Sequence, residues 1–263
     1  MSTLTIDHAL CKKDHLCIKE CPVNIFQAGK DGFPIINSEN LQRCIFCGHC
    51  QAVCPQCAIT LNQIDPSRLE KTNILAVPLD NISQIIKSRR SIRNFKKESL
   101  PRETINNFLN LCSYAPTGGN NQSVKWLFVE SRDTMNRIRE SVASWARTTE
   151  KFSFLADAFD RGIDIIFRGA PHLAIAYSGS EYGSEQIDCC IAASTLELLA
   201  SSQGVGACWA GFFLIACFAS YNPLIKILDL PEGNKAIAAL MLGYSQHSFC
   251  RIPFRKTADV KYI

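Results

Sequence analysis

The chain has 263 residues, of which 47% are hydrophobic and 20% are charged, and its formal net charge is +4. This composition is ordinary for a globular protein with one large domain or two smaller ones, and the charge is too small to indicate a nucleic-acid or membrane-surface partner. The longest apolar run, residues 205–219, is shorter than the roughly 20 residues of a membrane helix, and Met1–Leu10 lacks the features of a secretory signal. We therefore expect a cytoplasmic protein that binds neither nucleic acid nor membranes.

The 14 cysteines are unevenly distributed along the chain. Eight fall within residues 11–57, and six are scattered from Cys112 to Cys250. Disulfides are not expected, because nothing in the sequence indicates secretion. The scattered six are flanked by Ala, Leu and Ile, so we expect them to pack as small hydrophobic side chains.

The amino-terminal cysteines form a repeat with a spacing of 33 residues. The second copy, residues 44–55, reads C-x2-C-x2-C-x3-C-P, which is the complete bacterial ferredoxin run. The first copy, residues 11–22, differs from it at one registered position, where Asp14 replaces the equivalent of Cys47. A pair of zinc sites is the competing interpretation, but zinc knuckles usually have two C-x2-C pairs far apart. The repeat therefore favours two iron–sulfur clusters.

Residues 1–64 resemble a two-cluster bacterial-type ferredoxin domain with [4Fe–4S] clusters. The resemblance implies crossed ligation, in which each copy gives three ligands to one cluster and one ligand to the other. One cluster would be held by Cys44, Cys47, Cys50 and Cys21, and the other by Cys11, Asp14, Cys17 and Cys54.

Asp14 leaves two interpretations open. Its carboxylate is either a fourth iron ligand, which binds less firmly than thiolate, or a surface group beside a three-iron [3Fe–4S] cluster. Cys57 lies outside both runs, and we assign it no cluster role.

Residues 65–81 are expected to form a connector, and residues 82–263 a second domain. Residues 187–206 are typical of a helix that ends at a glycine C-cap. Four apolar segments are predicted as strands: 126–130, 172–177, 207–213 and 236–244. Such alternation indicates an α+β fold with helices layered around one sheet.

The stretch KSRRSIRNF, residues 87–95, is the first with distinctive chemistry in the second domain. Arg89, Arg90 and Arg93 surround Ser91 without a neighbouring acid. Guanidinium groups fork onto phosphate oxygens, and a serine hydroxyl can add a further hydrogen bond. The stretch therefore indicates a phosphate site, although a basic run alone is also typical of a solvated surface.

The stretch YAPTGGNNQSVKW, residues 114–126, is a turn rich in Pro, Gly and Asn before a predicted strand. Its two glycines let the backbone approach a flat ligand, and Asn120 and Gln122 carry paired donors and acceptors. Alone, this stretch predicts only a loop.

The motifs RRSIRNF, APTGGNNQ, GVGACWAGFF and CRIPFRK, in this order, resemble the nitroreductase family of flavin enzymes over roughly residues 80–263. The resemblance implies a homodimer with FMN at the subunit interface. The phosphate and ribityl chain would be held by Arg89, Arg90, Ser91 and Arg93, helped by Arg251 and Arg255. The partner subunit's loop would contribute Pro116, Thr117, Gly118, Asn120 and Gln122, and the backbone amides of Ala210 and Gly211 would lie near the flavin ring edge.

Two positions depart from the family pattern. Ser-Val-Lys separates Gln122 from Trp126, whereas the family often has Pro-Trp directly after the glutamine. Phe249 stands where a better-known branch has lysine, which leaves fewer cations near the phosphate.

The two resemblances together imply a flavo-iron–sulfur oxidoreductase. Electrons would pass from the clusters to FMN and on to a small acceptor such as a nitroaromatic or a quinone. The donor would be a ferredoxin or NAD(P)H, and no catalytic side chain is predicted because the flavin carries the chemistry. The alternative is a non-enzymatic module that relays electrons to a partner protein. An open pocket beside the flavin would favour the enzyme, and a covered flavin face the relay.

Overall fold

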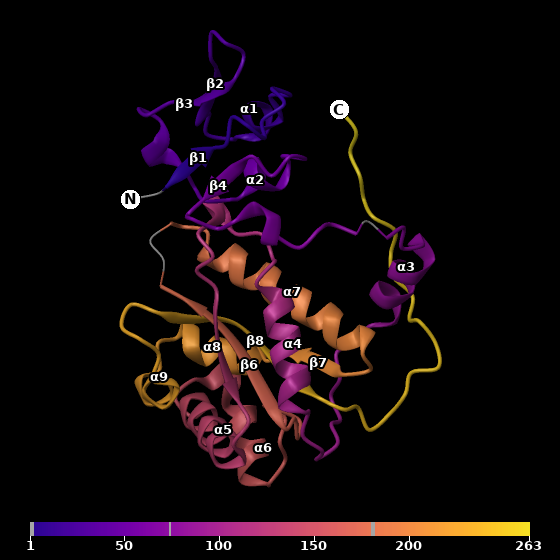
Figure 1. Ribbon diagram of the computed structural model, residues 1–263. Coiled ribbons are helices and arrows are strands. Elements are labelled where there is room, and N and C mark those ends of the chain that lie inside the picture. Colours follow the sequence, from indigo (N-terminus) through magenta and orange to yellow (C-terminus); the bar gives the residue numbers. More distant parts are fainter. Residues whose placement is uncertain (1–2, 74, 180–181) are drawn as a thin grey trace. The chain divides into compact units, whose positions relative to one another are not determined.

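The computed structural model describes residues 3–73, 75–179 and 182–263. The chain divides into two compact units, which Figure 1 draws in the colours of the sequence. The first unit comprises residues 1–76 with 119–121, and the second comprises residues 77–118 and 122–263. The stretch 65–81, expected as a connector, contains a 3-10 helix (Pro66–Arg68) and the start of helix α3 (Leu79–Ser88).

The first unit is built from two antiparallel strand pairs and short helices. Ile25, Phe26 and Ile59 are almost fully buried in its core, and cysteine side chains pack around them. A core this small contributes little stability by itself. The pairs are β1 (Leu4–Ile6) with β4 (Ile59–Leu61) and β2 (Phe26–Ala28) with β3 (Pro34–Ile36), and the helices are α1 (Leu16–Glu20), α2 (His49–Ala52) and a 3-10 turn (Leu41–Arg43).

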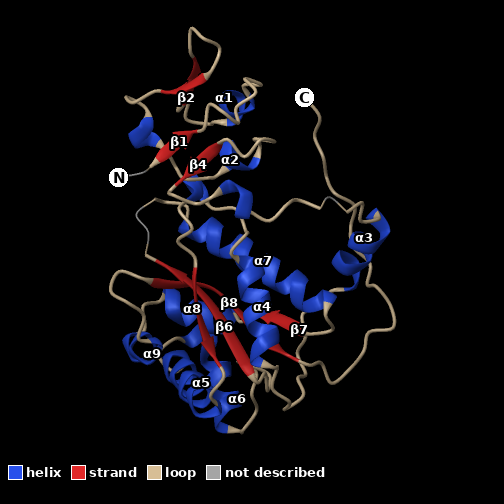
Figure 2. Cartoon of the chain, viewed as in Figure 1, coloured by secondary structure: helices blue, strands red, loops and turns tan. Residues whose placement is uncertain are grey.

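A four-stranded antiparallel sheet forms the centre of the second unit, as Figure 2 shows. The side chains of its inner strands alternate between two hydrophobic clusters, with Leu173 and Ile175 in one and Ala174 and Ala176 in the other. The strands, in spatial order, are β5 (Lys125–Val129), β6 (His172–Ser178), β8 (Lys235–Gly243) and β7 (Gly206–Trp209).

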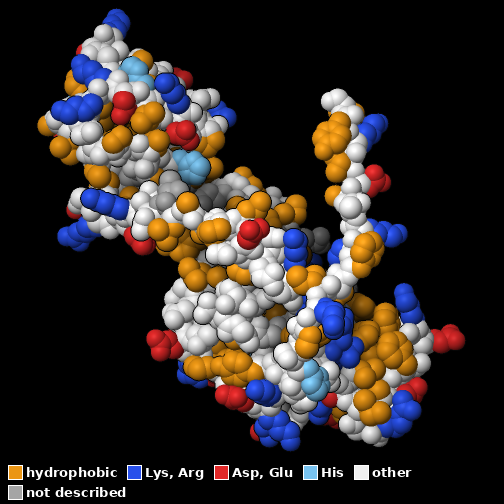
Figure 3. All heavy atoms as spheres, turned by 90° about the vertical axis from the view of Figure 1, so that its right-hand side faces the viewer, with side chains coloured by type: hydrophobic (Ala, Val, Ile, Leu, Met, Phe, Trp, Pro, Cys, Tyr) orange, Lys and Arg blue, Asp and Glu red, His pale blue; other side chains and the backbone are white. Residues whose placement is uncertain are grey.

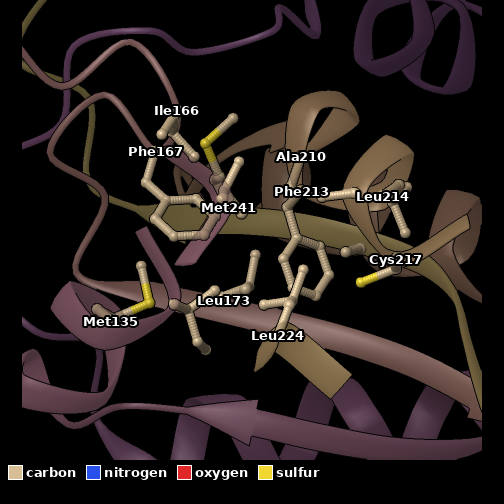
Figure 4. Packing of buried hydrophobic residues seen from close by; sticks show 14 of the residues in the cluster. Met135, Ile166, Phe167, Leu173, Ala210, Phe213, Leu214, Cys217, Leu224 and Met241 are labelled. Carbon is tan, nitrogen blue, oxygen red and sulfur yellow. The ribbon is translucent and has the colours of Figure 1, made fainter. Parts of the chain in front are cut away.

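Helices cover both faces of this sheet and confirm the expected α+β fold. In one cluster, Phe213, Leu214 and Leu224 pack around Leu173 and Met241 (Figure 4). One face carries α4 (Arg102–Cys112) and α7 (Glu185–Ser202), and the other carries α5 (Arg132–Ala146), α8 (Gly211–Phe218) and α9 (Asn222–Leu228). Helix α6 (Ser153–Asp160) packs beside α5, and short 3-10 turns span Gly118–Asn120 and Glu150–Phe152.

The predicted strand 207–213 is wrong in its second half. Strand β7 ends at Trp209, and the chain turns at Ala210 and enters helix α8 at Gly211. Ala207, Cys208, Ala210 and Phe213 of this run are buried and its other residues are apolar or glycine, so it has no polar side chains from which a helical or strand period could be read. The other three predicted strands are confirmed to within one residue at each end.

The helix predicted for residues 187–206 is confirmed as α7, with earlier ends. It runs from Glu185 to Ser202, and the glycine that ends it is Gly204, whose φ is +71°. The amide of Val205 then donates to the carbonyl of Ala200, which closes the helix. Gly206 already belongs to strand β7.

The scattered cysteines only partly follow the expectation of buried packing. Cys112, Cys189, Cys208 and Cys217 are buried, whereas Cys190 and Cys250 are exposed. Among the described residues no single helix is long and apolar enough to cross a membrane; the pair α8 and α9, bent by 111°, meets those limits jointly.

Candidate functional site

The 33-residue repeat is visible in the backbone of the first unit. Helix α1 begins at Leu16 and α2 at His49, and left-handed residues recur at the same spacing. Their φ values agree closely across the copies: Lys13 (61°) with Phe46 (53°), His15 (60°) with Gly48 (72°), and Asn24 (53°) with Cys57 (53°). The two copies therefore share one loop conformation, and Cys57 occupies the turn position that Asn24 fills in the first copy.

Two small cavities lie in this unit, and each is lined by four of the predicted ligands. Each set combines three residues of one copy with a cysteine from the other copy. One cavity is lined by Cys11, Asp14, Cys17 and Cys54, and the other by Cys21, Cys44, Cys47 and Cys50. Cys57 lines neither cavity.

Backbone amides donate to one sulfur in each set. Ile25 N–H donates to Cys21 Sγ at 3.3 Å, and Ala58 N–H donates to Cys54 Sγ at 3.4 Å. These four residues are again related by the repeat. Hydrogen bonds to ligand sulfurs are one of the ways in which a protein sets the potential of an iron–sulfur cluster.

Asp14 lies on the wall of its cavity and is itself exposed. Its Oδ1 accepts a hydrogen bond of 3.1 Å from Leu16 N–H at the start of α1. A carboxylate has two oxygens, so this bond leaves the second one available to iron.

Burial opposes ionisation of two of these thiols. It raises the pKa of Cys50 to about 11, and it also raises the pKa of Cys17, with further contributions from the nearby Cys11, Cys54 and Asp14. Both are therefore thiols at neutral pH in metal-free protein, and binding metal would release their protons. In the part of the chain that the structure describes, no three His, Cys, Asp or Glu side chains converge on a point suited to a single metal ion.

In the second unit, the first arginine of the RRSIR stretch is held by an acid from helix α7. Arg89 Nη1 donates to Glu197 Oε1 at 2.6 Å, and the two side chains are 26% and 9% exposed. Both line a cavity of about 510 Å³, which we call the Arg89 cavity. Arg90, Lys96 and Phe249 lie on the same wall.

Among the described residues, Arg90 has an unpaired donor that an anion could satisfy. Its Nη2 donates to the carbonyl of Lys87 at 2.8 Å, but its buried Nε has no hydrogen-bond partner among the described residues. Partial burial, followed by the positive charges of Arg255 and Arg89, lowers the pKa of Arg90. An anion in this cavity would relieve the repulsion between these groups.

Ser91 and Arg93 do not line the Arg89 cavity. Ser91 lies beside Ala207 of β7 in a parallel bridge, and the amide of Ile92 donates to the Ala207 carbonyl at 2.9 Å. Burial raises the pKa of the Cys208 thiol. The Arg93 charge and the Ser91 side chain lower it in part. The structure thus places Arg89 and Arg90 at the Arg89 cavity, and Ser91 and Arg93 near Cys208.

None of residues 114–118 or 122 of the second unit lines the Arg89 cavity. Gly118 N–H donates to Asp188 Oδ1 at 3.0 Å, and the Thr117 hydroxyl accepts from the amide of Gln122 at 3.0 Å. Thr117 and Gln122 line a separate cavity of about 120 Å³, Pro116 is exposed, and Asn120 has a φ of +55°.

Ala210 and Gly211 differ in what their amides can offer. The amide of Ala210 already donates to the carbonyl of Ala239 at 2.9 Å, whereas Gly211 begins helix α8, where amides lack intrahelical acceptors. A Cβ on Gly211 would meet nothing within 4 Å, so the backbone there is open to a ligand. Arg251 and Arg255 lie in the exposed segment that follows β8.

Sequence reasoning missed Glu197 and Asp188, two buried acids on α7. Glu197 holds Arg89, and Asp188 accepts from Gly118 and from the Ser184 hydroxyl at 2.8 Å. The sequence offers one signal for such residues, which is an acid placed among the apolar residues of a predicted helix. A buried carboxylate needs a partner, so such an acid predicts a hydrogen bond or an ion pair.

Replacing Glu197 by alanine is expected to lower the free energy of unfolding of the second unit by about 1–3 kcal/mol. The half-buried guanidinium of Arg89 would lose its counter-ion. Urea denaturation followed by circular dichroism measures the change, with Glu140→Ala on the exposed side of α5 as control. Equal midpoints for both variants would show that the ion pair contributes nothing.

Two protein families match different parts of this chain. The Nitroreductase family matches residues 86–244, and the 4Fe-4S dicluster domain matches residues 3–55. A relative from Archaeoglobus fulgidus, provisionally named NADH dehydrogenase/NAD(P)H nitroreductase, is 24% identical over 63% of this chain and 86% of its own. An uncharacterized ferredoxin from Methanocaldococcus jannaschii is 33% identical over 21% of this chain and 89% of its own.

The fold of the second unit also matches a solved structure. A nitroreductase with bound FMN from Desulfitobacterium hafniense has a TM-score of 0.59 and 25% identity, over 69% of this chain and 97% of that one. The family match spans more than half of the chain. The chain therefore belongs to the nitroreductase family and carries a 4Fe-4S dicluster ferredoxin domain at its N-terminal end.

Proposed function

We propose that this chain is an FMN-dependent oxidoreductase that takes electrons in at its ferredoxin domain and delivers them to a small acceptor such as a nitroaromatic or a quinone. The observation that carries the proposal is the presence, in one chain, of two four-ligand cavities and a basic cavity in a nitroreductase fold. When bound, the clusters carry single electrons and FMN exchanges one or two.

Several features of the second unit support FMN. The Arg89 cavity gathers cations, the Nε of Arg90 lacks a partner among the described residues, and Gly211 is open to a flat ligand. Arg90, with Arg89 fixed by Glu197, would bind the phosphate, and Ser91 and Arg93 would contact the chain beyond it. The solved nitroreductase from Desulfitobacterium hafniense contains bound FMN.

Extraction of the flavin tests this assignment. Chromatography of the denatured protein should yield FMN and no FAD, at about one per chain, because the basic cavity suits one terminal phosphate. FAD as the main flavin, or protein that takes up neither, would contradict the proposal.

In the first unit we propose that the cavity sets are the ligand sets. Cys21, Cys44, Cys47 and Cys50 would hold one [4Fe–4S] cluster, and Cys11, Asp14, Cys17 and Cys54 the other. The amides of Ile25 and Ala58 would stabilise the negative charge on Cys21 and Cys54.

The role of Asp14 can be tested by substitution. We expect mild oxidation of the wild type to give a three-iron [3Fe–4S] form at this site, because oxygen binds iron of a sulfide cluster less firmly than sulfur does. Asp14→Cys should suppress that conversion, and Asp14→Ala should leave three irons there even in reduced protein. Electron paramagnetic resonance and iron analysis distinguish these states. Equal spectra and equal iron content for Asp14→Ala and wild type would show that Asp14 does not bind iron.

We further propose that the chain forms a homodimer. Leu79, Ile82 and Ile86 form one face of α3 at helical spacing and are 79%, 44% and 55% exposed. Hydrophobic side chains also lie exposed along the C-terminal segment, as Figure 3 shows, with Phe254 at 87% exposure. A second copy is the occupant that would cover these surfaces and place the loop of residues 114–122 near the Arg89 cavity of its partner. Light scattering of the purified protein would contradict this if it gave the monomer mass.

A further inference from the structure

We propose that the second unit has a binding site for a small organic anion, in a cavity lined by none of the residues expected to bind FMN. The cavity has a volume of about 470 Å³ and is walled by residues 94–99, the start of α5 and the loop 164–171 before β6. This volume lies in the range of pockets that hold small ligands. We call it the α5 cavity.

Positive charge dominates the α5 cavity. Its wall carries four cationic side chains and two carboxylates. The cations are Lys97, Arg132, Arg139 and Arg168, and the carboxylates are Glu130 and Asp164.

Both carboxylates have their own partners. Glu130 pairs with Arg102, which lies outside the cavity wall. Asp164 Oδ2 lies 3.5 Å from Arg139 Nη1, and its two oxygens accept from the amides of Phe167 (2.8 Å) and Gly169 (3.0 Å). The acids therefore leave much of the cationic charge of the wall uncompensated.

The remaining cations have donors to offer a ligand. Over residues 3–73, 75–179 and 182–263, Lys97, Arg132 and Arg168 form no ion pair, and the buried Nε of Arg139 has no hydrogen-bond partner. Arg168 has a φ of +58°, and the Asp164 hydrogen bonds on either side of it fix that turn. The backbone that carries Arg168 is thus fixed at the cavity before any ligand arrives.

The floor of the α5 cavity is apolar. Phe95, Met135 and Phe167 line it and are 2%, 6% and 2% exposed, and Figure 4 shows Met135 and Phe167 within the core cluster. A rim of cations above an apolar floor suits an anion with an apolar body, such as an aromatic carboxylate or an aryl phosphate.

The α5 cavity is separate from the Arg89 cavity. The two share one lining residue, Gln246, whose side-chain amide donates to the carbonyl of Phe95 at 2.8 Å. None of the residues expected to bind FMN lines the α5 cavity. Arg168 nevertheless acts on the thiol of Cys208 together with the proposed FMN contact Arg93, so the flavin content of each variant has to be measured beside its anion binding.

Titration calorimetry of the flavin-loaded protein tests the site with benzoate, phenyl phosphate and inorganic phosphate as probes. We expect benzoate or phenyl phosphate to bind saturably with a Kd of about 1 mM or tighter, and inorganic phosphate at least about tenfold more weakly because it lacks an apolar body. The two organic probes distinguish a carboxylate ligand from a phosphate ligand.

Variants connect the binding to the cavity. Arg168→Gln and Arg132→Gln should each weaken the organic probe at least about tenfold, because each removes a charge-assisted hydrogen bond. Arg137→Gln, on α5 but outside the cavity, should not change the affinity. All three variants should keep their visible flavin absorption. If either arginine variant does not fold, Lys97→Gln, at an exposed position of the same cavity, takes its place and should also weaken binding of the organic probe.

Three results would overturn the proposal. The first is that neither organic probe saturates the protein. The second is that the wild type and the cavity variants bind the probe with equal affinity, and the third is that the probe releases the flavin. Wild-type protein that holds no flavin before any probe is added would instead count against the proposed function.

Discussion

Cys47→Ala is expected to slow reduction of the flavin by reduced ferredoxin by at least about two orders of magnitude, while the flavin stays bound. Cys47 lines the cavity shared with Cys21, Cys44 and Cys50, so its loss removes one of four thiolate ligands from the proposed electron entrance. Stopped-flow absorbance under anaerobic conditions measures the rate.

Cys57→Ala is the matched control, because Cys57 lies in the same unit but lines neither cavity. The flavin of this variant should be reduced at the wild-type rate. A parallel run with NADH shows whether hydride reaches the flavin directly. If reduced ferredoxin acts equally fast on Cys47→Ala and wild type, electrons do not enter through this cluster.

The double substitution Arg89→Ala and Ser91→Ala is expected to weaken FMN binding by at least about tenfold, because each charge-assisted hydrogen bond contributes about 1.5–3 kcal/mol. Arg89 is held toward the basic cavity by Glu197, and Ser91 lies on the neighbouring part of the same segment. Titration of flavin-free protein with FMN, followed by quenching of flavin fluorescence, gives the Kd.

Arg161→Ala, an exposed arginine just after α6, serves as control and should bind FMN as the wild type does. An unchanged Kd in the double variant would show that Arg89 and Ser91 do not bind the FMN phosphate.

The first unit was largely predictable from sequence because its ligands recur at fixed spacing. Subtracting 33 from Cys47 identifies Asp14, and the structure places both residues in equivalent loops with matching φ values. The exchange of Cys21 and Cys54 between the two sets was implied by the resemblance to two-cluster ferredoxins, and the two cavities group the same residues. The amide donors to Cys21 and Cys54 do not follow from sequence, because they depend on backbone geometry.

The second unit was less predictable where distant segments meet. Glu197 and Arg89 form an ion pair across 108 positions, and no local pattern connects them. The α5 cavity similarly assembles Lys97, Arg132 and Arg168 from three separate segments. Strand β7 and helix α8 were predicted as one strand because a continuous apolar run shows neither helical nor strand periodicity.

The most direct test of the account is the iron and flavin content of anaerobically purified protein, read with its ultraviolet–visible spectrum. We predict about eight irons and about one FMN per chain, with flavin bands superimposed on broad iron–sulfur absorption. The iron content should fall to about seven where the Asp14 site has lost its fourth iron. Flavin without iron, iron without flavin, or zinc in place of iron would contradict the claim that one chain joins a ferredoxin to a flavin site.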